Sequence, residues 1–335
     1  MATDKNKKIS VIIPNLNGRN FLIPCLASLR QQNFQDFELI IVDNGSSDDS
    51  ITIIKREFPE ATIYNFTKNE GFSRAINQGI SLSTGEYIFL LNNDTELDIN
   101  CLKVLNNFLD NNPQAGFGAT KMLFFNNHEI INNTGDIFSK YGLASKRGWQ
   151  EKDNGQYNKP EPIFGACAGG AIYRKILFDE VGKFDEDFFA YLEDIDFSFR
   201  AQIRGYKCWY IPQAIVYHVD GGTSLKNKKN VDYLMVRNSL FVIFKNFPTS
   251  WLIMFSPFIL LNQIKNILSG LKHHYLKLVF RGYGEFIKKL PKLYRKRKGI
   301  QKNCYVTKKY LLSIISKKYP FPIKKNIYEF FFRHR

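Results

Sequence analysis

The N-terminal part of the chain alternates short apolar segments with amphipathic ones, and this alternation restricts the folds that the chain can adopt. Strands are predicted at residues 9–13, 37–42, 61–66 and 86–91, and helices at 19–31, 48–57 and 71–83 lie between them. Repeated strand–helix–strand units build parallel sheets with right-handed crossovers. We therefore predict an α/β fold around a mostly parallel sheet.

Polar residues follow these strands at their carboxyl ends, which is where α/β enzymes bind ligands. The polar segments are Pro14-Asn15, Asp43–Asp48, Asn69–Gly71 and Asn92–Asp94. Because the strands are expected to be parallel, all four loops should open on one rim of the sheet.

The end of the fourth strand carries the strongest chemical signal. Five apolar residues, Tyr87–Leu91, are followed directly by Asn92, Asn93 and Asp94. A carboxylate beside carboxamides can hold a hard divalent cation, and the cation can hold a diphosphate. In the alternative interpretation, Asn93 or Asp94 only caps a helix predicted at about 100–110.

His218 ends another apolar strand, predicted at 214–218 after a strand at 208–211. An imidazole at that position could complete a metal shell with Asp94. The alternative is a histidine that only makes hydrogen bonds.

Two further rim positions suit a nucleotide. Asp43 could accept a hydrogen bond from the N3–H of uracil or thymine, although it could equally form an Asx turn. The helix that begins after Asn69 and Gly71 could bind a phosphate or a base edge through free N–H groups and Arg74. The alternative is a capped helix with a surface arginine.

A second acidic cluster, Phe188–Asp196, places aromatic residues before carboxylates at the start of a helix predicted at about 193–205. Partial desolvation raises the pKa of a carboxyl group and suits it to general-base work. Asp194 is our candidate base. Alternatively, Glu193, Asp194 and Asp196 only compensate the helix dipole.

Composition excludes several classes of protein. With 335 residues and 44% hydrophobic residues, the chain can bury a full core and carry an appendage. The five cysteines are scattered without a CxxC pair, which argues against a disulfide framework or a zinc site and favours a cytoplasmic location. Residues 1–8 contain no apolar h-region, so no secretory signal is expected. The HExxH, GxSxG and P-loop patterns of metalloproteases, serine hydrolases and P-loop NTPases are missing.

The net charge of +16 is concentrated at the C-terminus. Residues 265–335 hold 20 Lys and Arg against two Glu, whereas residues 1–264 hold 27 basic and 29 acidic residues. Apolar runs at 241–244 and 251–261 precede the basic region, and the second is too short to span a bilayer. We therefore predict an interfacial contact with an anionic membrane rather than with nucleic acid. The alternative is a helix packed on the body, followed by a solvated basic tail.

The order of these motifs resembles family 2 glycosyltransferases over about residues 9–247. The resemblance is carried by Ser10–Asn17, Val42–Asp48, Asn69–Phe72, Leu91–Asp94, Gly182–Glu186, Glu193–Arg200 and His218–Ser224. Arg237-Asn238 and the aromatic run after them look like the rhamnosyltransferase-type bacterial members. This chain has Asn92 where many relatives have the first Asp of a DxD motif, so Asp94 is the only carboxylate of that triplet.

The resemblance implies a GT-A fold, a Rossmann-like, doubly wound, mostly parallel sheet over residues 1–247. Residues 248–335 would form a helical, basic, membrane-associating extension. By the same resemblance, Asp43 would read the base, Asp94 would bind Mg²⁺ or Mn²⁺ with help from His218, and Asp194 would deprotonate the acceptor. The remaining donor-side candidates are Pro14, Asn15, Asn17, Asn69, Gly71, Arg74, Asn92 and Asn93, and those for the acceptor or for support of the site are Gly169, Glu193 and Arg200.

The predicted function is inverting transfer of a sugar, with rhamnose favoured, from a dTDP- or UDP-sugar to a hydroxyl group. The acceptor would be a cell-surface glycan or a lipid-linked molecule at the inner face of the cell membrane. The alternative is a non-catalytic nucleotide-sugar-binding or scaffold subunit of a membrane polysaccharide-assembly complex.

Overall fold

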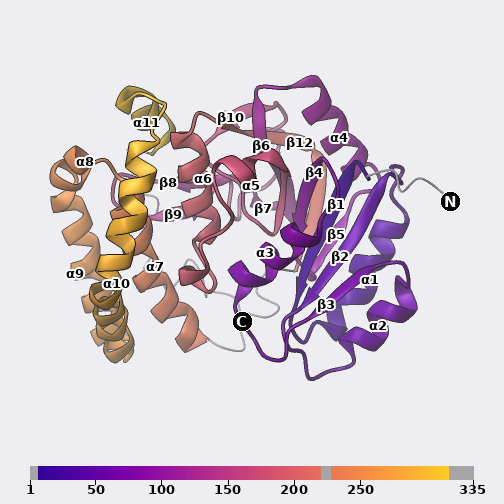
Figure 1. Cartoon of the computed structure of the whole chain (residues 1–335), viewed down its shortest axis with the longest axis horizontal. Helices are drawn as coiled ribbons and strands as arrows, with labels where there is room; N and C mark the ends of the chain where they lie inside the picture. The colour runs from indigo at the N-terminus through magenta and orange to yellow at the C-terminus, as the bar shows by residue number, and fades with distance from the viewer. Residues whose placement is uncertain (1–6, 220–227, 317–335) are drawn as a thin grey trace.

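The computed structural model describes residues 7–219 and 228–316. The predicted segment Asp220–Ser224 lies outside these ranges. In Figure 1 the sheet and the first helices lie on the right, and the C-terminal helices lie on the left.

A ten-stranded mixed sheet forms the centre of the molecule, in the order β10-β12-β6-β11-β4-β1-β2-β3, with β5 paired to β12 and β7 paired to β6. β1 pairs in parallel with β2 and β4, and β2 pairs in parallel with β3, as the alternation predicts. The strands are β1 (Ile9–Asn15), β2 (Phe37–Asp43), β3 (Thr62–Asn65), β4 (Tyr87–Leu91), β5 (Thr95–Leu97), β6 (Ala115–Phe124), β7 (Asn127–Asn133), β10 (Glu161–Ile163), β11 (Gly170–Arg174) and β12 (Lys207–His218).

Helices cover both faces of this sheet. Leu22 of α1, Ile54 of α2 and Leu105 of α4 share one core with the sheet, whereas Ile76 of α3 and Phe197 of α6 belong to the core on the opposite face. The bounds are α1 (Arg19–Arg30), α2 (Ser50–Glu57), α3 (Phe72–Leu82), α4 (Cys101–Asn111), α5 (Ile176–Glu180), η1 (Glu186–Phe188) and α6 (Glu193–Ile203). The predicted doubly wound, mostly parallel α/β architecture is confirmed.

The sequence pattern did not indicate strand β6 or the individual strands that directly follow it. β6 lies between β11 and β12, antiparallel to the first and parallel to the second. The region at 123–162 contains β7 and a separate hairpin of β8 (Asp136–Phe138) and β9 (Ala144–Lys146). The two strands predicted at 208–211 and 214–218 are one strand, β12, with an irregular register between Ile211 and Ile215.

The C-terminal helices form a unit that shares a third core with α6. They are α7 (Lys228–Asn246), α8 (Thr249–Met254), α9 (Ser256–Lys272), α10 (Leu276–Lys302) and α11 (Lys308–Ile314). Phe247 and Trp251 pack in this core, one on either side of the predicted boundary at residue 247. The extension is helical, as predicted, and it is packed on the body (Figure 1).

The predicted membrane contact is wrong for the first apolar run. Phe241, Val242 and Ile243 are buried, and so are Trp251 and Phe255 of the second run, because α7 and α8 pack these side chains against α6 and α10. Ile253 and Met254, at the end of α8, remain exposed, and so do Leu260 and Leu261 of α9. Of the helices within 7–219 and 228–316, none combines the length and the hydropathy needed to cross a bilayer.

Candidate active site

The carboxyl ends of β4, β1 and β2 lie side by side and are joined by side-chain hydrogen bonds. Asn93 Nδ2 donates to Asn15 Oδ1 at 2.7 Å, and Asn15 Nδ2 donates to Asp43 Oδ1 at 2.8 Å. Beyond β2, Asn44 Nδ2 donates to Asn69 Oδ1 at 3.1 Å, which ties in the loop after β3. The four loops predicted to share one rim therefore do so.

Asp43 is buried, and both of its carboxylate oxygens are engaged within the protein. Besides the bond from Asn15, Oδ1 accepts from Ser46 Oγ at 2.6 Å, and Oδ2 accepts from the Ser46 N–H at 2.9 Å. These bonds form the Asx turn that was the alternative interpretation of Asp43. A carboxylate offers about four lone-pair sites, so a base contact would have to use one that the turn leaves over. Pro14, half-buried in β1, brings Asn15 to this position and offers no N–H.

Two predicted donor-side residues shape the loops. Asn17, with a φ of 51°, accepts a hydrogen bond from the Ser47 N–H at 2.8 Å and so ties the loop after β1 to the loop after β2. Asn69 Oδ1 accepts from the Gly71 N–H at 2.9 Å and closes the turn before α3.

The start of α3 differs from the prediction of free N–H groups. The Ser73 N–H donates to the Phe189 carbonyl at 3.1 Å, so the prediction is wrong for this group. Gly71 has a φ of 95°, and a Cβ built on it would lie 2.6 Å from Phe189 Cδ2, so the aromatic loop closes over this helix end. Arg74 pairs with Glu70 at 2.7 Å on an exposed face, as the surface-arginine alternative requires.

Asp94 and His218 lie together, as the sequence predicts. β5 follows Asp94 and pairs antiparallel with β12, which sets His218 opposite Thr95. His218 Nε2 is 3.2 Å from Asp94 Oδ1, and His218 Nδ1 is 3.3 Å from Asn132 Oδ1. The helix-cap alternative is wrong for Asn93 and Asp94, since Asn100 is the residue that precedes α4.

This pair fits one edge of a divalent-cation site. A carboxylate oxygen and an imidazole nitrogen are suitable ligands for Mn²⁺. Residues 7–219 and 228–316 contain no group of three or more His, Cys, Asp or Glu placed to hold a metal. A cation at Asp94 and His218 would therefore take its other ligands from a bound diphosphate and water, as Mg²⁺ commonly does.

Asp194 stands at the beginning of α6 and is connected to the same rim. Its Oδ1 accepts from the Ile195 N–H at 2.8 Å, and its Oδ2 accepts from the Ala168 N–H at 3.4 Å. The next residue, Gly169, accepts from the Asn92 N–H at 3.1 Å, so one short backbone link joins the base candidate to the triplet that contains Asp94. Burial raises the pKa of the Asp194 carboxyl, against the lowering effect of the two N–H donors.

Two more buried carboxyl groups surround Asp194, and one was missed by the sequence. Burial, and then the charge of Asp194, raise the pKa of Glu193 well above its usual range. The same two causes raise the pKa of Asp136, at the start of β8, to about 8. Asp136 was missed because it stands in an Asn-rich segment, where an aspartate reads as an ordinary turn residue.

Gly169 and Arg200 support the site. The Asn92 carboxamide nitrogen lies 2.8 Å from where a Cβ on Gly169 would be, so a larger residue there would displace the Asn92 side chain. Arg200 makes an ion pair with Asp196 and donates to the carbonyls of Val181, Gly182 and Lys183. It therefore fixes α6 to the loop at 181–183.

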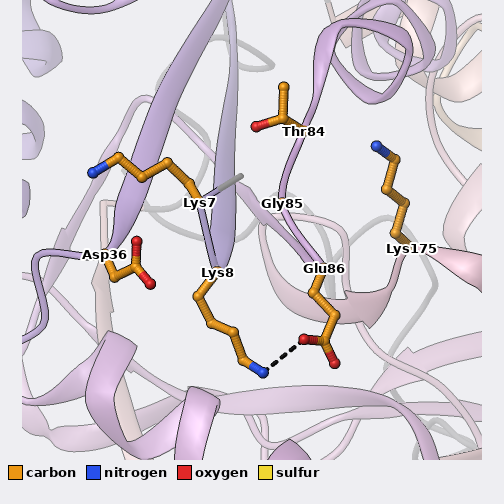
Figure 2. Close-up of a pocket in the computed structure, with 7 residues that line it drawn as sticks. All are labelled: Lys7, Lys8, Asp36, Thr84, Gly85, Glu86 and Lys175. Atoms are coloured by element: carbon orange, nitrogen blue, oxygen red, sulfur yellow. Dashed lines mark hydrogen bonds and ion pairs between the residues drawn. The ribbon is translucent and has the colours of Figure 1, made fainter. Parts of the chain in front are cut away.

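A separate pocket of about 380 Å³ opens at the amino ends of β1 and β4, on the rim opposite Asp43 and Asp94. Figure 2 shows its seven lining residues, with Lys8 paired to Glu86. None of the predicted site residues lines it.

Comparison with known proteins gives a consistent family. The family model described as glycosyl transferase family 2 matches residues 10–182. A PGL/p-HBAD biosynthesis glycosyltransferase of Mycobacterium bovis is 29% identical over 196 residues, which cover 57% of this chain and 68% of the relative. A poly-beta-1,6-N-acetyl-D-glucosamine synthase of Staphylococcus aureus is 25% identical over 224 residues, covering 63% of this chain and 52% of the synthase.

Solved structures show the same fold at low identity. GalNAc-T7 with UDP, GalNAc and Mn²⁺ aligns with a TM-score of 0.61 at 14% identity, over 86% of this chain and 57% of that one. S. aureus TarS 1–349 aligns with a TM-score of 0.54 at 17% identity, over 88% of this chain and 86% of that one.

Proposed function

Because the chain belongs to glycosyl transferase family 2, we propose that it moves a sugar from a UDP- or dTDP-sugar to a hydroxyl group, with inversion at the anomeric carbon. The acceptor would be a cell-surface glycan or a lipid-linked molecule. The observation that carries this proposal is the arrangement of the rim. There, Asp94 lies 3.2 Å from His218, and Asp194 is linked to the same strand end through Ala168 and Gly169.

In the proposed reaction, Asp194 accepts the proton of the acceptor hydroxyl as its oxygen attacks C1 of the donor sugar. A carboxylate with a raised pKa suits this work, because proton transfer is most efficient when the pKa of the base is near the working pH. The two backbone N–H donors hold the carboxylate in one orientation. The leaving nucleoside diphosphate gains charge as the bond breaks.

Asp94 and His218 would hold a Mg²⁺ or Mn²⁺ ion at the leaving group. When bound, such an ion neutralises the charge that builds on the diphosphate. The fold neighbour GalNAc-T7 contains UDP and Mn²⁺, which supports a divalent cation and a pyrimidine nucleotide for this chain. Rhamnose, and with it dTDP, rests on the motif resemblance of Arg237-Asn238.

The test is a screen of donor turnover across UDP- and dTDP-sugars, with Mn²⁺, with Mg²⁺ and with EDTA. We expect release of a nucleoside diphosphate from one donor, and loss of this activity with EDTA. Tight nucleotide-sugar binding without release from any donor, with acceptors present, would instead favour the non-catalytic scaffold subunit.

We also propose that the chain lies on the inner, anionic face of the cell membrane through α9. Leu260, Ile264, Leu268 and Leu271 are 60%, 50%, 57% and 55% exposed, and their spacing puts them along one side of the helix. Exposed Lys272, at the end of α9, would face lipid phosphates beside this apolar stripe.

Vesicle sedimentation tests the membrane proposal. Ile264→Glu with Leu268→Glu should abolish binding to phosphatidylserine-containing vesicles, because the substitutions put charge on the stripe. Ile176→Glu is the matched control, since Ile176 is 54% exposed on α5 of the body. Equal binding by the double variant and the control would contradict the proposed face.

A further inference from the structure

The loop that leads into α6 holds an unfavourable backbone conformation. Phe189, Tyr191 and Leu192 have φ values of 66°, 69° and 66°, although none of them is glycine. Such conformations persist in L-residues only where the surroundings enforce them. The loop ends at Glu193 and Asp194, so its conformation sets where the candidate base stands.

A single buried side chain of α7 captures this loop. Asn238 is completely buried, and its Nδ2 lies 3.1 Å from the Phe188 carbonyl oxygen, 2.8 Å from that of Ala190 and 2.7 Å from that of Tyr191. One carboxamide nitrogen has two hydrogens, so at least one of them is shared between carbonyls. An amide group thus replaces the secondary-structure partners that the irregular loop lacks.

The neighbouring residue sets the orientation of that carboxamide. Arg237 Nε donates to Asn238 Oδ1 at 2.9 Å, which leaves the amide nitrogen facing the loop. The same guanidinium donates to the carbonyls of Asp187 and Phe188 at 3.0 and 2.7 Å. It is anchored in turn by Glu285 of α10 at 3.2 Å.

Lysines of α10 hold the beginning of the loop. Lys289, Lys292 and Lys296 all make ion pairs with Asp187, at 2.6 to 2.8 Å. Burial alone would raise the pKa of Asp187, but the three ammonium groups outweigh it and hold the pKa well below its usual range. The extension thus contacts the loop through both α7 and α10.

We propose that Asn238 is a positioning residue for the transfer reaction: its carboxamide, oriented by Arg237 and Glu285, holds the left-handed loop at 188–192 so that Asp194 faces the acceptor. This inference rests on the proposed function. It gives the C-terminal unit a role in catalysis, since the side chains that fix the loop belong to α7 (Arg237 and Asn238) and to α10 (Glu285 and the three lysines).

The test compares Asn238→Ala with the unchanged full-length chain. Truncation removes the Asn238 donor from the loop carbonyls, so we expect kcat to fall about 10²-fold, the loss that a small misplacement of a reacting group produces. The affinity for the nucleoside diphosphate should stay close to the wild-type value, because most of its predicted contacts lie on the strand ends. Hydrogen exchange of a peptide covering residues 186–193 should become faster.

Asn262→Ala is the matched control, because Asn262 is 1% exposed on α9 and, among the residues that the structure describes, makes no hydrogen bond to the loop. It should keep wild-type kcat and wild-type exchange at 186–193. If Asn238→Ala does not fold, Glu285→Gln tests the same chain of contacts from a half-buried position, with a smaller fall in kcat and faster exchange expected.

The outcomes separate the two proposals. If the unchanged chain transfers no sugar, the proposed function fails. If the chain is active and Asn238→Ala keeps both wild-type kcat and wild-type exchange at 186–193, the positioning role is refuted. Equal losses of kcat in Asn238→Ala and Asn262→Ala would also refute it, because replacing a buried asparagine far from the loop would then have the same effect.

Discussion

Replacing Lys245 by Met tests how much of the stability depends on one buried charge cluster. Lys245 of α7 is 1% exposed, and its Nζ lies 2.5 Å from Asp185 Oδ2 and 2.8 Å from Asp196 Oδ1. Met keeps most of the length of the side chain but removes the charge, so both carboxylates stay buried without this partner.

The expected cost follows from what the two carboxylates retain. Removing one partner of a buried ion pair costs about 3–5 kcal/mol. Asp196 keeps Arg200 at 2.9 Å and Asn246 at 2.8 Å, and Asp185 keeps Lys296. We therefore expect the lower end of that range, about 3 kcal/mol.

The pH dependence adds a second check with a defined sign. Burial would raise the pKa of Asp185 and of Asp196, but the neighbouring cations outweigh it and lower both. A lowered pKa contributes stability above the unfolded-state value of about 4, and this contribution is lost as the pH falls. The difference in the free energy of unfolding between the wild-type chain and Lys245→Met should therefore be largest near pH 7 and should become smaller below about pH 4.

Urea melts followed by tryptophan fluorescence measure these differences. Lys292→Met is the matched control, since Lys292 is 55% exposed and its partner Asp187 keeps two other lysines. The control should lose less than about 1 kcal/mol. A loss of stability for Lys245→Met that equals the loss in the control, or that does not change with pH, would show that the buried charge cluster does not stabilise the fold in this way.

Three further predictions concern the rim and the loop. His218→Ala should weaken Mn²⁺-dependent binding of UDP or dTDP by at least about tenfold, the loss found even for groups that only orient a metal ligand; calorimetric titration with and without Mn²⁺ measures it, and an unchanged affinity would contradict the metal role. Asp136 has a pKa raised to about 8, so its stabilising contribution is complete below about pH 4 and is lost as the pH rises to 8. Asp136→Asn should remove this dependence of the free energy of unfolding on pH, which is up to about 1.4 kcal/mol per pH unit. Thermal melts between pH 5 and 8 measure it. An unchanged pH dependence would mean that other groups cause it. Gly71→Ala should cost more than about 1 kcal/mol in urea melts, because alanine is strained at a φ of 95° and its Cβ would meet Phe189; a neutral substitution would mean that the loop at 189 moves freely.

The parts of the fold that the sequence predicts are those with strong periodicity. β1, β2 and β4 are continuous apolar strands with helices between them, so their parallel order and their shared rim follow from general rules. β6 begins Ala115-Gly116-Phe117-Gly118, and small residues give a weak strand signal. It is a strand because Phe117 packs between the sheet and α6, a tertiary contact that local patterns do not contain.

Some residues of the candidate site could also be predicted from the sequence, and others could not. The Asp94–His218 pair could be predicted because His218 ends an apolar strand and Asp94 closely follows another. The roles of Arg200 and Asn238 could not, because both act by hydrogen bonds to carbonyls of irregular loops far away in the sequence. The apolar runs after residue 240 resemble a membrane segment in composition, yet the packing of α7 and α8 on α6 buries much of them.

The central claim is that Asp194 is the base of a sugar transfer at this rim, and the most direct measurement is the turnover of Asp194→Asn with the donor and acceptor that the wild-type chain uses. We expect kcat to fall by at least about 10²-fold, the usual contribution of a general base, with unchanged affinity for the nucleoside diphosphate. In the wild-type chain, kcat should fall as the pH is lowered through the raised pKa of Asp194. Near-normal turnover by Asp194→Asn would contradict the assignment.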